Sequence, residues 1–175
     1  MTRPPVDDPG QSAACSNNIL LIGYGNPGRL DDGLGPALAE QIDKLALPGL
    51  DVEVDYQLNI EHAEQLARYN VVIFADADSS GPEPFWFRRI QPVAEKVNYS
   101  SHAMKPEAVL AVARDLFTAG CEAFLLGIRG YDFNEYEEKL SDKARINLAK
   151  ALEYITASVK NGRIEEVNPG DADVS

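Results

Sequence analysis

One stretch near the N-terminus, residues 18–35, constrains the fold more than any other part of the chain. An apolar run of strand length, 19–22, is followed at once by the turn-forming segment Gly23-Tyr-Gly-Asn-Pro-Gly28. Its glycines let the backbone turn sharply and run close to another group. Apolar residues at helical spacing come next, at Leu34, Leu38, Ile42 and Leu45. The stretch therefore predicts a buried strand, a tight loop and an amphipathic helix.

The rest of the chain continues this alternation of strands and helices. Further strands are predicted at 52–56, 71–75 and 123–128, with an edge piece at 85–90 that Pro92 ends. Helices are predicted at about 35–46, at 63–69, from Pro106 to a cap at Gly120, and from Ser141 through Val159. The first and third strands are apolar throughout, which indicates a sheet covered on both faces. We therefore predict an α/β fold with three layers, a mostly parallel twisted sheet flanked by helices.

The length of 175 residues suits a single domain. Residues 1–16 are rich in Pro, Asp, Ser and Gly and have almost nothing to bury, so we predict a disordered arm. The α/β domain is predicted to span 17–163. Residues 164–175 are predicted to form a disordered acidic tail.

Composition excludes several classes of function. The formal net charge of −12 would repel the phosphates of nucleic acids and anionic membranes. Only two cysteines are present, Cys15 and Cys121, and they form neither a zinc cluster nor a disulfide framework. Cys121 is expected to be a buried neutral thiol rather than a nucleophile. No apolar run is long enough to span a membrane, and no secretory leader is visible, so we expect a cytoplasmic protein.

The glycine segment matches the dinucleotide pattern GxGxxG and lies between a predicted strand and a predicted helix. In dinucleotide sites a pyrophosphate binds at the N-terminus of that helix. Here Asp31 and Asp32 would lie near the anion, and each would repel it by about 1 kcal/mol even in water. The helix also starts late, because Pro36 suits its first position. The pattern therefore favours a cation or metal over a dinucleotide at this loop.

Acidic residues and a histidine are predicted to meet at one edge of the sheet. They are Asp31 and Asp32 after the first strand, Asp76 and Asp78 at the end of the third, and His102 before the third helix. Loops at the carboxyl ends of parallel strands line a common crevice, where ligands bind. Two carboxylates and one imidazole suit a divalent ion such as Ni²⁺, Zn²⁺, Co²⁺ or Mn²⁺, with positions left for water or substrate.

Each of these ligand candidates also has a simpler interpretation. Asp32 could only mark the start of a helix, but if Pro36 is the first helical residue, then Gly35 is the cap and Asp32 has no capping role. Asp76 could instead hydrogen-bond the neighbouring loop, and the residues alone leave both interpretations open. His102, taken by itself, reads as an ordinary loop histidine.

The remaining polar candidates are expected to have structural roles. Asp31 and Asp78 are expected to be solvated or to support the ligands from outside. His62 is expected to lie at the start of a helix, although it also follows a strand end. Glu137 and Glu138 are expected to form the acidic approach to the last helix.

Three motifs occur in a characteristic order, namely Gly23-Tyr-Gly-Asn-Pro-Gly-Arg-Leu-Asp-Asp-Gly-Leu-Gly35, Phe74-Ala-Asp-Ala-Asp78 and Ser101-His102. In this order and at this separation they resemble the motifs of the [NiFe]-hydrogenase maturation endopeptidases. The similarity extends over about residues 18–160. It implies an α/β fold with a twisted, largely parallel sheet. It also implies an enzyme that removes a C-terminal extension from the hydrogenase large subunit after nickel has been inserted.

The same resemblance implies metal contacts through Asp32, Asp76 and His102, with nickel supplied by the substrate. In this hypothesis Asp32 and Asp76 also form the catalytic site, and the partner of a monomeric protein is the large-subunit precursor. Two other functions stay open. One is a noncatalytic nickel-dependent chaperone for the same partner. The other is a small dinucleotide-binding oxidoreductase, in which Asp55 would bind the ribose.

Overall fold

A computed structural model describes residues 18–93 and 103–167 of the chain. The strands are β1 (Ile19–Tyr24), β2 (Leu50–Asp55), β3 (Val71–Asp78), β4 (Phe85–Ile90) and β5 (Glu122–Arg129). The helices are the 3₁₀ turn η1 (Leu30–Gly33) and the α-helices α1 (Leu34–Asp43), α2 (Ile60–Leu66), α3 (Pro106–Phe117) and α4 (Asp142–Asn161). This order confirms the predicted α/β fold class.

The five strands form one sheet in the order β2-β1-β3-β5-β4. β2, β1, β3 and β5 run parallel to one another, and β4 pairs antiparallel with β5 at the edge. The chain leaves β1 first toward β2 on one side and then crosses to β3 on the other. That reversal leaves a crevice outside the carboxyl ends of β1 and β3, where ligands bind in open α/β sheets.

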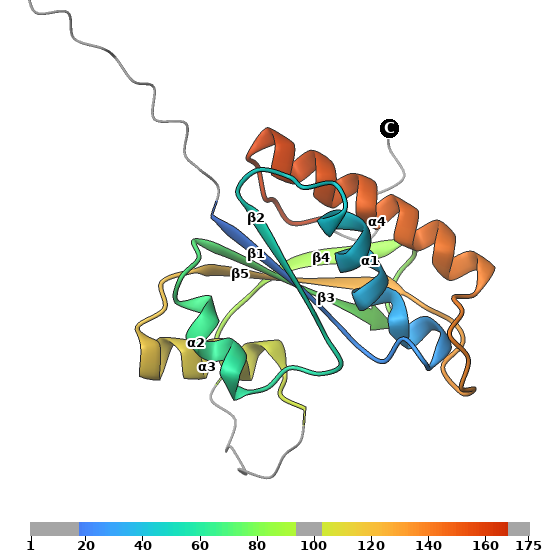
Figure 1. Cartoon of the computed structure of the whole chain (residues 1–175), viewed down its shortest axis with the longest axis horizontal. Coiled ribbons are helices and arrows are strands. Elements are labelled where there is room, and N and C mark those ends of the chain that lie inside the picture. Colours follow the sequence, from blue (N-terminus) through green and yellow to red (C-terminus); the bar gives the residue numbers. More distant parts are fainter. Residues whose placement is uncertain (1–17, 94–102, 168–175) are drawn as a thin grey trace, which may run out of the picture.

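Helices cover both faces of the sheet, as Figure 1 shows with α1 and α4 on one side and α2 and α3 on the other. Each face has its own buried cluster. Leu38, Phe87 and Ile155 belong to the cluster under α1 and α4. Phe74 and Val109 belong to the cluster under α2 and α3. The continuous apolar character of β1 and β3 thus reflects burial from both sides, as predicted.

β1 and α1 approach each other very closely, and glycines allow it. A Cβ atom on Gly23 would lie 2.2 Å from the carbonyl oxygen of Gly35, and one on Gly35 would lie 2.4 Å from the carbonyl oxygens of Tyr24 and Ala75. Such separations are far shorter than real contacts, so no larger residue fits there without movement. The two glycines therefore bring the start of α1 directly against the carboxyl ends of β1 and β3.

Several predicted helix boundaries were wrong. α1 begins at Leu34 rather than at Pro36, which is its third residue, and Gly33 precedes it. Proline fits there because the first helical N–H groups have no partner within the helix. α2 begins at Ile60 because Asn59 and His62 form a capping box. The predicted cap of α3 at Gly120 is also wrong, because the helix ends at Phe117 and its cap is Thr118, which takes a positive φ of 56°.

The predicted domain boundary at residue 163 is too early. Residues 164–167 pack against the edge strand β4, where Phe87 and Val167 exchange backbone hydrogen bonds of 3.3 and 2.9 Å. Ile164 joins the cluster under α1 and α4, and a Glu166 carboxylate oxygen accepts from the N–H of Arg89 at 2.8 Å. Residues 1–17 and 168–175 lie outside the described parts, so the predicted disorder of the arm and of the remaining tail stays a prediction.

Candidate functional site

The candidate site lies at the carboxyl ends of β1 and β3, where Tyr24 and Asp76 are cross-strand neighbours. They directly follow the paired residues Gly23 and Ala75, so their side chains share the face that α2 and α3 cover. The Tyr24 hydroxyl donates a hydrogen bond to the Asp76 carboxylate. The Asp76 carboxylate also accepts a hydrogen bond of 2.7 Å from the backbone N–H of Ala77. Asp76 is thus fixed in orientation by groups from two strands.

The environment of Asp76 changes its acidity. Burial raises the pKa of this carboxyl to about 6, and the negative charges of Asp32 and Asp78 add to the rise. The hydrogen bonds from Tyr24 and Ala77 oppose it. Burial and the neighbouring Asp76 also raise the pKa of Tyr24, so the phenol stays protonated and donates. A carboxyl that titrates near neutral pH is suited to accept or release a proton in a reaction.

Asp32 reaches the same site from η1. Its carboxylate accepts a hydrogen bond of 3.1 Å from the backbone N–H of Asn26, within the glycine loop. Gly25 lies against the backbone of Asp32. It has a φ of 139°, and a Cβ atom on it would be 2.1 Å from the backbone carbonyl oxygen of Asp32. No helix is capped by the Asp32 side chain, as predicted, because α1 begins after Gly33. The structure therefore brings the Asp32 carboxylate near enough to Asp76 for its negative charge to raise the pKa of Asp76.

His102, the third predicted ligand, lies outside the described residues. Within 18–93 and 103–167, no group of three His, Cys, Asp or Glu side chains has the arrangement of a metal site. Two carboxylates from different segments do meet, and carboxylate oxygens are suitable ligands for a divalent ion. The described residues thus fit an incomplete, open site, and the metal-binding roles of Asp32, Asp76 and His102 stay predictions.

Asp31 was expected either to be solvated or to support the ligands from outside, and the structure rules out the first of these positions. Its side chain is 0% exposed. The carboxylate accepts hydrogen bonds from the N–H groups of Tyr131 and Asp132 and from both the N–H and the hydroxyl of Ser141, at 2.7–3.0 Å. Burial alone would raise the pKa of Asp31, but these bonds together hold it below its ordinary value. Asp31 therefore joins η1 to the loop between β5 and α4.

Asp78 supports a different loop, the turn between β3 and β4. Its carboxylate accepts from the N–H groups of Ser80 and Gly81, both at 2.9 Å, and from the indole N–H of Trp86 at 2.6 Å. The ring of Trp86 lies over Gly127, where a Cβ atom would be 2.3 Å from it. Since Gly127 pairs with Asp76 on one side and with Trp86 on the other, the indole borders the candidate site.

His62 has the structural role that was predicted for it. It lies in the first turn of α2, is 3% exposed, and its Nδ1 accepts a hydrogen bond of 3.1 Å from the N–H of Asn59. Its Nε2 faces Asp55 Oδ2 at 3.6 Å and Glu53 Oε1 at 3.8 Å. Asp55 is therefore engaged within the protein, and the N–H of Asn26 in the glycine loop is donated to Asp32. Both arrangements argue against the dinucleotide alternative.

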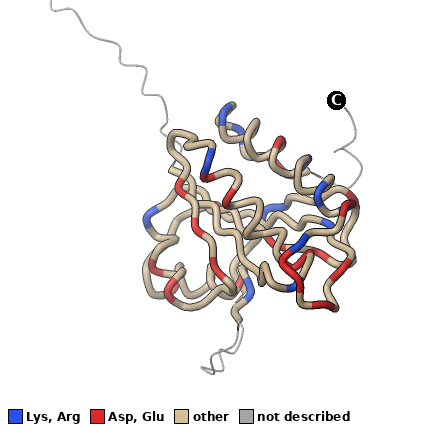
Figure 2. The backbone as a smooth tube through the Cα atoms, turned by 45° about the vertical axis from the view of Figure 1, so that its right-hand side comes forward, with Lys and Arg blue, Asp and Glu red and all other residues tan. Residues whose placement is uncertain are grey.

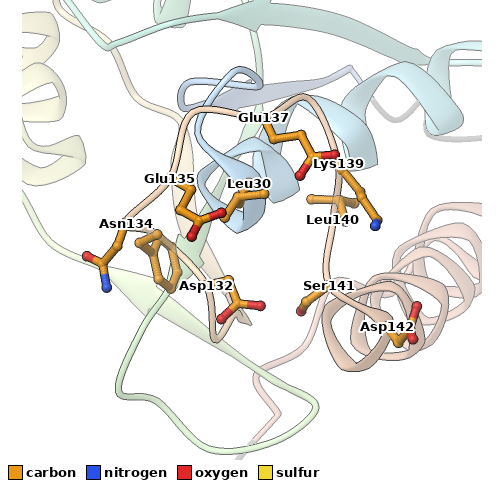
Figure 3. Close-up of a pocket in the computed structure, with 10 residues that line it drawn as sticks. Leu30, Asp132, Asn134, Glu135, Glu137, Lys139, Leu140, Ser141 and Asp142 are labelled. Carbon is orange, nitrogen blue, oxygen red and sulfur yellow. The ribbon is translucent and has the colours of Figure 1, made fainter.

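A cavity of about 480 Å³ lies between η1, which carries Asp32, and the loop that precedes α4. Figure 3 shows Leu30 on one side and residues between Asp132 and Asp142 around the rest. The loop is strongly acidic, and Figure 2 shows the red segments of Asp and Glu concentrated on it at the right of the view. Glu137 does more than precede the last helix, because its carbonyl oxygen accepts from the N–H of Leu30 at 3.0 Å.

Cys121 is buried, as predicted, and burial raises the pKa of its thiol. The sequence analysis missed Tyr24, and it named Asp31 without foreseeing its contacts with the loop before α4. A tyrosine at the carboxyl end of a buried strand needs a partner for its hydroxyl, and that requirement could have drawn attention to Tyr24. For Asp31 no local signal exists, since its partners lie 100–110 residues further along the chain.

Proteins of known structure share this fold. No protein-family model matches the chain. A [NiFe] hydrogenase maturation protease from Thermococcus kodakarensis superposes with a TM-score of 0.65 at 23% identity, covering 83% of this chain and 94% of that one. The hydrogenase maturating endopeptidase of E. coli has a TM-score of 0.61 at 21% identity, covering 86% and 96%.

The sequence comparison agrees with the structural one. A protein of Methanocaldococcus jannaschii, provisionally named a hydrogenase maturation protease, is 26% identical over 155 residues, which are 82% of this chain and 97% of that protein. The chain thus has the fold of a class of peptide hydrolases with an open α/β sheet. Within that class it resembles the hydrogenase maturation proteases, which confirms the resemblance predicted from its motifs.

Proposed function

We propose that this protein is an endopeptidase that removes the C-terminal extension of a [NiFe]-hydrogenase large-subunit precursor after nickel insertion. The observation that carries the proposal is that Asp32 and Asp76 lie near each other at the carboxyl ends of β1 and β3. The similarity to named maturation proteases over more than four fifths of the chain supports the same reaction.

Nickel belongs to the substrate in this proposal. Two carboxylates and the imidazole of His102 would be a weak permanent cage, because soft cysteine ligands are lacking. They would suit the recognition of an ion that the precursor already holds. Asp32, Asp76 and His102 would then bind free nickel weakly and would complete their contact with the ion in a precursor that contains nickel.

The same acids can serve peptide hydrolysis. A metal ion near the scissile bond supplies charge that polarises a carbonyl group. Asp76, with a pKa of about 6, is ionised in most molecules at neutral pH and can accept a proton from an attacking water. We therefore propose a carboxylate-assisted hydrolysis, with Asp76 as the first choice for the base and Asp32 as its partner.

The test compares two forms of the precursor. Purified protein is incubated with nickel-loaded and with nickel-free large subunit, and the shortened product is followed by mass spectrometry. We expect cleavage of the nickel-loaded form alone. Equal cleavage of both forms would contradict recognition of nickel, and cleavage of neither would contradict the proteolytic function.

Variants then assign the residues. Asp32→Asn and Asp76→Asn should each lower the cleavage rate by at least about a hundredfold, the scale on which lost proton transfer acts. Asp43→Asn, an exposed change at the far end of α1, serves as the matched control and should cleave normally. A chaperone without activity would instead bind the precursor and never shorten it, even as the unaltered protein.

Charge and composition support a proposal for the setting of this activity. We propose that the protein acts in the cytoplasm as a monomer and binds a protein partner rather than a nucleic acid, because its net charge of −12 disfavours polyanions. Within the described residues no helix is long and apolar enough to cross a membrane. Light scattering of the purified protein, alone and with precursor, measures the oligomeric state.

A further inference from the structure

The Asp31 carboxylate joins two segments that are remote in sequence. Asp31 lies in η1, next to the proposed ligand Asp32. It accepts four hydrogen bonds, and every donor lies in the segment between β5 and α4, whose last residue is Ser141. For comparison, the donors to Asp78 all lie within eight residues of it, in the turn after β3 and in β4. Asp31 therefore fixes one loop relative to another.

Backbone contacts run in the opposite direction across the same boundary. The N–H of Leu30 donates to the carbonyl oxygen of Glu137, and the N–H of Asp31 donates to the carbonyl oxygen of Asp132, both at 3.0 Å. Leu30 holds a positive φ of 50°, a conformation that a branched side chain rarely adopts without support. η1 is thus held in an unfavourable conformation by the loop that it contacts.

We propose that Asp31 is a positioning residue that sets the place of Asp32 by holding η1 against the loop before α4. This inference rests on the function proposed for Asp32. The same two segments border the cavity in Figure 3, since Leu30 and Ser141 both line it. Loss of the Asp31 carboxylate should therefore displace Asp32 and the cavity wall together.

The first arm of the test measures turnover. Asp31→Asn keeps the shape of the side chain but turns an NH₂ group toward N–H donors. Its kcat with nickel-loaded precursor should fall at least about tenfold, because one hydrogen bond to a charged group is worth that factor or more. The control is Val159→Ala, a buried change about 25 Å along α4 from its first residue. At a temperature where circular dichroism shows both variants folded, Val159→Ala should retain kcat within about twofold.

The second arm does not depend on activity. Amide hydrogen exchange in Asp31→Asn should accelerate at least about tenfold at Leu30, Asp31 and Tyr131, with β1 unchanged. Val159→Ala should leave these amides unchanged. Ser141→Ala, which removes one of the four bonds, gives a milder version if Asp31→Asn does not fold.

The outcomes separate the two proposals. Faster exchange together with a lower kcat supports the positioning role. Unchanged exchange, or faster exchange with an unchanged kcat, overturns it, the latter because the contact would then be purely structural. If the unaltered protein cleaves no precursor, the proposed function fails, and the exchange measurement still decides whether Asp31 holds η1 to the loop.

Discussion

The hydroxyl of Tyr24 donates a hydrogen bond to the carboxylate of Asp76, and the two side chains project from adjacent positions on β1 and β3. This hydrogen bond stabilises the ionised form of Asp76, whereas burial stabilises its neutral form. This pair therefore sets the pH at which Asp76 becomes a carboxylate. Its predicted consequences can be measured in activity and in stability.

Tyr24→Phe should move the acidic limb of the pH–rate profile upward. Without the hydroxyl, the pKa of Asp76 rises above its value of about 6. A higher pH is then needed before Asp76 is ionised and can act as a base. Initial cleavage rates between pH 5 and 9 give the midpoint of that limb. Tyr69→Phe is the control, since Tyr69 bonds Asp51 at 2.8 Å with the same chemistry, away from the site. Equal midpoints in all three proteins would disprove this role of Tyr24.

Asp76→Asn should stabilise the protein at neutral pH and have little effect at acidic pH. The folded-state pKa of about 6 lies above the ordinary value of 3.8, so the unfolded chain releases its proton first as the pH rises. Stability conferred by the acid is therefore lost between about pH 4 and 6, and the loss is complete above that window. The difference corresponds to about 3 kcal/mol at most.

Urea unfolding of both proteins at pH 4.5 and at pH 8 measures this effect. The advantage of Asp76→Asn should appear mainly at pH 8. An advantage of equal size at both pH values would mean that the burial of a charge is not its cause.

Gly25→Ala should destabilise the protein by at least about 2 kcal/mol and displace Asp32. The backbone φ of 139° is strained for alanine, and its Cβ atom would lie 2.1 Å from the Asp32 carbonyl oxygen. Gly120→Ala is the matched control, because nothing lies within 4 Å of its added Cβ atom. That change should be neutral or slightly stabilising. Thermal unfolding compares the two, and equal shifts in Tm would count against the close approach of the glycine loop and η1.

Nickel should quench the fluorescence of the protein if Asp32 and Asp76 contact the ion. Trp86 is the only tryptophan, and its strand lies two positions across the sheet from β3, about 10 Å away. Titration with Ni²⁺ should therefore reduce its emission in the unaltered protein. The double variant Asp32→Asn with Asp76→Asn should lose this quenching, whereas persistent quenching would place the ion elsewhere.

Most of the fold could be predicted because its signals are local. The apolar runs of β1 and β3 and the glycine loop between β1 and η1 are visible within short windows. The meeting of Asp32 and Asp76 also follows from a general rule, since both come after parallel strands. Their contact across the crevice needed only the correct order of elements.

The rest depended on contacts that no short window contains. Asp31 looks like a second surface acid beside Asp32, and only the fold brings Tyr131 and Ser141 to it. The cap at Thr118 was missed because glycine is the usual residue for that conformation. Residues 164–167 looked like a polar tail because the edge of β4 that they meet is invisible in the sequence.

The pairing of Val167 with Phe87 affects the tendency of the protein to aggregate through its edge strand. An outermost strand with open N–H and C=O groups can recruit a strand from another molecule and so seed ordered aggregates. Here the backbone of Phe87 is already engaged on its outer side, and the N–H of Arg89 is held by Glu166. Residues 164–167 thus protect the β4 edge of the sheet against the addition of a further strand, and shortening the protein after Gly162 would remove this protection.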